Sequence, residues 1–162
     1  MKNVVISGIN LFEGGPLSIY YDCLDEIIKL GYEKKFNIIC LVHKCELFER
    51  YKDKFNFIEF PKSRSSYLYR FYYEYFYFSK YFKDKNVDIW ISLHDISSNV
   101  KAKKRFVYCH NPTPFLKPDR NVFKFSKSVF FMSLFYKYLY AINIKKNTAV
   151  IVQQDWLRKE FK

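Results

Sequence analysis

Residues 4–18 read VVISGINLFEGGPLS and pass from an apolar run, through a glycine turn, directly into a sequence typical of a helix. The apolar run is typical of a buried strand, and Pro16 suits the first turn of a helix. Because Gly14 and Gly15 have no Cβ, backbone N–H groups at this turn can approach an anion, which the helix dipole also favours. The segment therefore predicts contact with a phosphorylated ligand.

Apolar runs and amphipathic segments alternate along the rest of the chain. The predicted strands cover residues 4–9, 36–42, 55–60, 87–93, 105–109 and 149–152. The predicted helices cover residues 16–30, 45–51, 66–83 and 125–144, with a short one beginning near Asp155. Short buried strands separated by helices are typical of a parallel sheet covered on both faces. We therefore predict an α/β fold, a doubly wound parallel sheet.

Composition narrows the class of protein and of partner. The 162 residues suit one domain, and a chain that is 49% hydrophobic with 4 glycines and 5 prolines is neither disordered nor fibrous. The formal net charge of +12 favours an anionic partner. Nucleic acid, an anionic membrane and a phosphorylated substrate all satisfy that condition.

The cysteines and the amino terminus indicate the compartment. The four cysteines show no CxxC spacing and three lie in apolar segments, so we expect free thiols in a reducing compartment, without disulfides or structural zinc. The amino terminus lacks the features of a signal peptide, and no segment of about 18 residues is free of charge. We expect a cytoplasmic protein, at most peripheral to the inner face of the cell membrane.

Polar residues follow the predicted strands at the edge where a parallel sheet binds its ligands. His94 and Asp95 come after one strand, and His110 and Asn111 follow the next, with Thr113 in a proline-flanked loop. We expect these side chains to face one crevice and to contact substrate.

Other interpretations of these residues stay open. Asp95 can instead cap a short helix over residues 96–100, and His110 can be a structural loop histidine. The Gly14–Gly15 turn can exist for its geometry alone. His43 follows a strand as well, and we expect it at the surface without a role.

Taken together, four features resemble the N-terminal half of a glycosyltransferase family 4 enzyme. They are the early Gly14–Gly15 loop, the pair His94–Asp95, the segment VYCHNPTP at 107–114 and the segment VIVQQDWLR at 150–158. The resemblance covers essentially residues 1–162. It implies a retaining, metal-independent transferase of GT-B architecture, in which two Rossmann-like domains face each other across a cleft.

The resemblance also implies roles. Gly14 and Gly15 would contact the phosphates of a nucleotide-sugar donor, and His110 would be the catalytic histidine near the reacting sugar carbon. The acceptor would be a glycan or a lipid-linked molecule of surface polysaccharide synthesis. No metal or other cofactor is expected. The main donor-binding domain, with its paired glutamates, would be a separate C-terminal unit that these 162 residues do not include.

Aromatic residues make up 22% of the chain and concentrate in residues 67–82 and 123–140. Their helical spacing suits a core-facing helix, but aromatic residues occur nearly all round the first segment. Core packing, contact with a membrane or lipid-linked acceptor, and contact with a protein partner are therefore all open. The alternative to an enzyme is a non-catalytic basic module that binds a membrane or nucleic acid. Nucleic acid is disfavoured because the aromatics are not displayed on strands.

Overall fold

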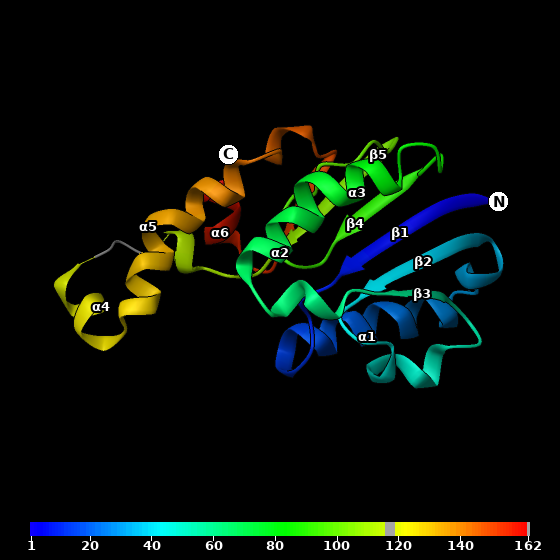
Figure 1. Cartoon of the computed structure of the whole chain (residues 1–162), viewed down its shortest axis with the longest axis horizontal. Coiled ribbons are helices and arrows are strands. Elements are labelled where there is room, and N and C mark those ends of the chain that lie inside the picture. The colour runs from blue at the N-terminus through cyan, green and yellow to red at the C-terminus, as the bar shows by residue number, and fades with distance from the viewer. Residues whose placement is uncertain (116–118, 162) are drawn as a thin grey trace.

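The computed structural model describes residues 1–115 and 119–161, and its centre is a six-stranded sheet in which every strand pair is parallel (Figure 1). The strands are β1 (Lys2–Gly8), β2 (Phe36–Val42), β3 (Asn56–Glu59), β4 (Ile89–Ser92), β5 (Lys104–Cys109) and β6 (Ala149–Val152). Their order across the sheet is β3-β2-β1-β4-β5-β6, the order of a Rossmann-like doubly wound fold. The predicted fold class is confirmed.

Helices cover both faces of this sheet (Figure 1). They are α1 (Gly14–Lys29), α2 (Tyr67–Tyr72), α3 (Phe78–Tyr81), α4 (Arg120–Phe125), α5 (Lys127–Ala141) and α6 (Asp155–Glu160). A π-helical turn, Tyr73–Tyr77, joins α2 to α3, and shorter 3-10 helices include Cys45–Tyr51 and Pro61–Arg64. Figure 1 shows α1 on one side of the sheet and α2 with α3 on the other, while α4 and α5 extend to the left.

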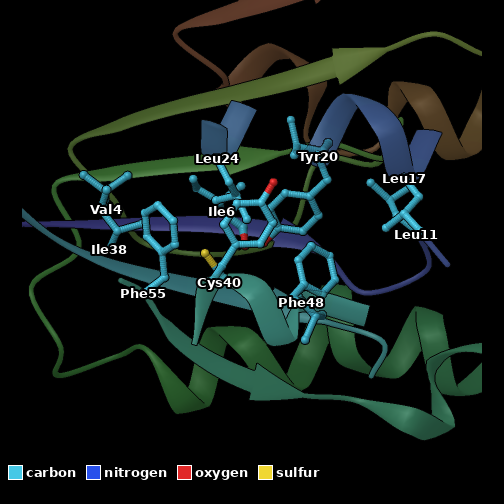
Figure 2. Close-up of a cluster of buried hydrophobic side chains, with 13 residues drawn as sticks. Val4, Ile6, Leu11, Leu17, Tyr20, Leu24, Ile38, Cys40, Phe48 and Phe55 are labelled. Atoms are coloured by element: carbon cyan, nitrogen blue, oxygen red, sulfur yellow. The ribbon is translucent and has the colours of Figure 1, made fainter. Parts of the chain in front are cut away.

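Strand alternation divides the core between the two faces. Val4 and Ile6 point into the cluster under α1, where Tyr20 and Phe48 meet edge to face with ring centroids 4.9 Å apart (Figure 2). Val5, between them in sequence, belongs to the opposite cluster. The fully buried Tyr20 hydroxyl donates to the Ile6 carbonyl at 2.9 Å, so the ring packs without leaving its polar atom unsatisfied.

The opposite face is built from aromatic side chains of the second helical layer. Phe78 and Phe82 from α3 and its end pack on Trp90 of β4, with ring centroids 5.6 and 5.2 Å from the indole. All three are essentially buried. The amino-terminal half of the same helical segment is different, because Tyr67, Leu68 and other apolar residues of α2 are exposed. Core packing therefore accounts for part of this aromatic segment, and exposed side chains such as Tyr67 and Phe76 are left out of the core.

Two further segments differ from the helices that the sequence suggested. Residues 96–100 form no helix; their backbone groups bond to other elements, as where the Asn99 N–H donates to the Glu74 carbonyl at 2.8 Å. The alternative interpretation of Asp95 as a cap for that helix is therefore wrong. The predicted helix at 125–144 is shorter and corresponds to α5, Lys127–Ala141, because Ser126 adopts extended backbone and caps α5 by accepting from the Val129 N–H at 3.3 Å. The preceding helix, α4, was not predicted.

Within residues 1–115 and 119–161, no helix combines the length and the apolar character needed to cross a bilayer.

Candidate functional site

The carboxyl ends of the parallel strands meet at one edge, and the loop after β1 forms its first part. Gly14 has φ +66°, a left-handed conformation that glycine adopts without a Cβ penalty. A Cβ built at Gly14 or at Gly15 meets nothing within 4 Å, so both positions face open space. Glu13 precedes the helix and makes no side-chain cap bond. The first N–H groups of α1 are therefore not covered by a capping side chain, as an anion site requires.

Asp95, which follows β4, connects three separate parts of the chain. Its Oδ1 accepts hydrogen bonds from the His110 N–H at 2.7 Å, the Asn111 N–H at 3.1 Å and the Tyr140 hydroxyl at 2.7 Å. Its φ of +67° is uncommon for a residue other than glycine, although aspartate tolerates it better than most. The carboxylate thus holds the loop after β5 against α5. Burial is the larger cause, and the nearby Asp95 charge the second, of a pKa of Tyr140 far above its usual range. The Tyr140 hydroxyl therefore stays protonated and remains a hydrogen-bond donor.

His110 lies at the rim of this arrangement. Its ring stacks on Tyr108 with centroids 5.5 Å apart, and its side chain is 21% exposed. Nδ1 is 3.4 Å from Asp95 Oδ1 but has no hydrogen-bond partner, so the loop backbone and the Tyr108 stack hold the ring at this edge. Asn111 Oδ1 accepts from the Thr113 N–H at 3.0 Å, an Asx turn that shapes the same loop. The structure therefore brings together Asp95, His110, Asn111 and Thr113.

His94 is placed differently from its neighbours, because its side chain is fully buried. Nδ1 lies 3.1 Å from the Ser7 carbonyl oxygen, which can only accept, so Nδ1 carries a proton. Nε2 lies 2.5 Å from Glu74 Oε1, and the Ser98 hydroxyl donates to the other oxygen of that carboxylate. One further proton must lie between the His94 and Glu74 side chains. In this arrangement His94 has no surface to offer a ligand, and any part in substrate binding is indirect.

The Gly14–Gly15 turn and His110 leave different strands of the sheet. β4 lies between β1 and β5, so the two loops begin about 10 Å apart, given the usual spacing of neighbouring strands. No hydrogen bond or ion pair joins the glycine turn to His110 in the described parts of the chain. The glycine turn and His110 therefore lie along the same edge of the sheet but do not form a single site by themselves.

Sequence reasoning missed two charged residues near this edge, Arg70 and Glu74. Both lie in the predicted aromatic helix, and both are buried. Arg70 Nη2 donates to the His94 carbonyl at 2.9 Å, while Glu74 bonds the imidazole of the same residue. Their spacing of four places them on one helical face, and two charges on an otherwise apolar face are the signal available in the sequence.

The sequence also led to predictions about metal binding and about the cysteine thiols. In the described ranges, no three His, Cys, Asp or Glu side chains gather in a way that would hold a metal ion. The expectation of metal independence stays a prediction. All four cysteines are free thiols, and burial raises the pKa of Cys40 to about 12. His43 is half-buried, with Nδ1 3.4 Å from the Ser63 hydroxyl.

The fold and this edge define an α/β protein with a Rossmann-like parallel sheet. Comparisons with known protein families, with curated proteins and with solved structures find no match for the chain. The fold class is thus the level at which the chain is placed, and its activity is a matter for proposal.

Proposed function

We propose that this chain is the acceptor-side, N-terminal domain of a retaining glycosyltransferase. It would act with a separate donor-binding domain to transfer a sugar from a nucleotide-sugar to a glycan or lipid-linked acceptor. The observation that supports this best is the Asp95-centred arrangement, which holds His110 at the carboxyl edge of a 3-2-1-4-5-6 parallel sheet. Ligands of such sheets bind at that edge.

The chemistry of glycosyl transfer gives each part of this edge a role. Positive charge develops on the sugar ring and negative charge on the departing phosphate, so polar groups near the first and anion donors near the second lower the barrier. The uncapped N–H groups that follow Gly14 suit the phosphate. His110 and Asn111, held by one carboxylate, suit the sugar. In a retaining reaction of this kind the leaving phosphate assists the incoming hydroxyl, so paired carboxylates are not required.

The test is a transfer assay on this chain combined with the separate donor-binding domain that the proposal requires, with radiolabelled nucleotide-sugars as donors and a membrane lipid extract as acceptor. His110→Ala should lower turnover about a hundredfold, the scale for losing one group that stabilises transition-state charge. Circular dichroism should change little, because the imidazole is at the rim and its main partner, Asp95, keeps its backbone donors.

Asn56→Ala is the control, since it removes an exposed polar side chain from the start of β3, at the opposite edge of the same sheet. It should leave turnover unchanged. Unchanged turnover in His110→Ala would remove that residue from the mechanism. Absence of transfer with every nucleotide-sugar would refute the proposed activity.

A second function, a non-catalytic module that binds a membrane surface, is favoured by one observation. Large apolar side chains are exposed on neighbouring helices: Tyr67, Leu68, Phe71 and Tyr72 on α2, and Phe131, Phe135 and Tyr138 on α5. Aromatic side chains with basic neighbours suit an anionic lipid interface. Co-sedimentation with vesicles of anionic lipid, compared with neutral vesicles, tests this function independently of transfer.

A further inference from the structure

A polar hollow of about 370 Å³ lies where the loop after β1 meets the turn before α2. Its lining combines two arginines, three serines and an asparagine with two aromatic rings: Asn10, Phe12, Ser63, Arg64, Ser65, Ser66, Tyr67 and Arg70. It lacks the residues singled out from the sequence. It is a separate feature from the Asp95 arrangement, although Arg70 bonds the backbone of His94 on its far side.

The hollow carries positive charge without a compensating carboxylate. Arg70 is 8% exposed; Nη2 donates to the His94 carbonyl, while its buried Nε has no hydrogen-bond partner. Arg64 stands over the ring of Phe12, 3.0 Å from the centroid. In the described residues neither arginine forms an ion pair. A buried cation is costly without an anion, so the hollow suits an anionic group. The buried Asn10 Oδ1, also unpartnered, can accept from a hydroxyl on the same ligand.

An apolar groove of about 190 Å³ adjoins this hollow along α2. It is lined by residues of α2, the adjoining π-helical turn, the segment after β4, and α5: Tyr67, Leu68, Arg70, Phe71, Tyr75, Ile96, Tyr136 and Leu139. Tyr67 and Arg70 line both spaces, so the two are neighbours. Tyr75, Ile96 and Tyr136 are buried and form the inner wall, whereas Leu68 is 81% exposed at the rim.

We propose that the two spaces form one binding site for an amphiphile with a phosphate-like anionic head and a hydrocarbon tail. The head would pair with Arg64 and Arg70, and the tail would lie along the groove toward α5. A free phosphate leaves the groove uncovered, and a neutral lipid leaves the buried Arg70 without its anion. If the chain acts in glycosyl transfer, this amphiphile is the acceptor; that clause alone rests on the proposed function.

The test is isothermal titration of the chain with ethyl, butyl and hexyl phosphate, and with inorganic phosphate and hexanol as the two partial ligands. Affinity should rise about fourfold for each added methylene that the groove covers. Hexyl phosphate should bind at least tenfold more tightly than hexanol, because a charged hydrogen-bond partner is lost with the head. Inorganic phosphate should bind more weakly than every alkyl phosphate in the series.

Two pairs of exposed variants separate head from tail. Arg64→Gln should weaken hexyl phosphate about tenfold and leave hexanol unchanged, while the matched Arg158→Gln on α6 should change neither. Leu68→Ser should weaken the binding of hexyl phosphate and leave the binding of ethyl phosphate unchanged. Leu30→Ser, at another exposed leucine, should change neither. None of these side chains is buried, so the variants should fold.

Equal affinity in Arg64→Gln and Arg158→Gln would overturn the proposal, and so would affinity independent of tail length. Binding to anionic vesicles without binding of hexyl phosphate would overturn it in favour of a membrane-facing surface. The titrations contain no nucleotide-sugar. A negative titration would therefore refute the amphiphile site without refuting the proposed transfer activity. A negative transfer assay would refute that activity without refuting the amphiphile site.

Discussion

Removal of the Asp95 carboxylate should release the loop after β5 from its hydrogen bonds and lower the free energy of unfolding of the domain. In Asp95→Ala three donors lose their acceptor: the N–H groups of His110 and Asn111, and the hydroxyl of Tyr140. Alanine must also adopt the left-handed φ of +67° that aspartate tolerates. Both effects act at a residue that is 6% exposed, where water cannot fully replace the lost acceptor.

The magnitude follows from this count. An unsatisfied buried donor costs about 1–3 kcal/mol, but the Tyr140 hydroxyl keeps a second acceptor, the Asn111 carbonyl at 3.1 Å. Taking about 1 kcal/mol for each of the two N–H donors and about 1 kcal/mol for the backbone conformation gives about 3 kcal/mol. Asp95→Asn retains an oxygen acceptor and a residue that tolerates positive φ. It should lose only the charge-assisted part of the bonds, about 1–2 kcal/mol.

Urea denaturation followed by circular dichroism measures the free energy of unfolding of the three proteins. Amide exchange of His110 and Asn111 should accelerate at least tenfold in Asp95→Ala while the amides of β1 stay protected, because the loop opens without the sheet. Tyr140→Phe should cost about 1 kcal/mol and be less than additive with Asp95→Ala, since they share a bond. A cost below about 1 kcal/mol for Asp95→Ala, or equal costs for Ala and Asn, would refute the reasoning.

Two further predictions concern glycines and pH. Gly8→Ala should destabilise the domain by about 2 kcal/mol in urea denaturation, because its Cβ would stand 2.6 Å from the buried Tyr20 ring. Gly14→Ala should cost about 1 kcal/mol for its φ of +66°, and Gly15→Ala under about 0.5 kcal/mol; equal costs at all three positions would contradict this reading. Burial lowers the pKa of His43, so the unfolded chain binds its proton more readily, and the free energy of unfolding should fall as pH drops below about 6.5. Thermal melts between about pH 5 and 8 should show a smaller slope in His43→Gln; an unchanged slope would exclude this contribution.

The strands were the most predictable part of the fold. Residues 36–42 and 149–152 were predicted to the residue, because continuous apolar runs are typical of parallel strands, even at the exposed edge strand β6. Helix type was less predictable. The aromatic segment at 66–83 contains a π-helical turn, and the helix at 96–100, the alternative interpretation of the segment after Asp95, is absent because tertiary partners take up its backbone groups. The spacing of hydrophobic residues along the chain predicts neither the π-helical turn nor the tertiary hydrogen bonds.

Part of the candidate site could also be predicted. The position of His110 and Asn111 after a strand was enough to place them at the edge where the strands have their carboxyl ends, because parallel strands end together. Nothing local distinguishes His94 from His110, since both follow a strand directly. Only the packing of the second helical layer puts Glu74 against one of them and leaves the other at the rim.

The sequence by itself determined the α/β class, the strand positions, the excess positive charge and the glycine turn, because periodicity, composition and backbone freedom are local properties. Tertiary structure decided which polar residues share a partner and which stay without one. Asp95 became the acceptor for two segments, and Arg70 was buried beside a hollow without a carboxylate. Such pairings join residues 15 to 45 positions apart, as for Asp95 with His110 and with Tyr140, so they depend on how the layers pack and not on the spacing along the chain.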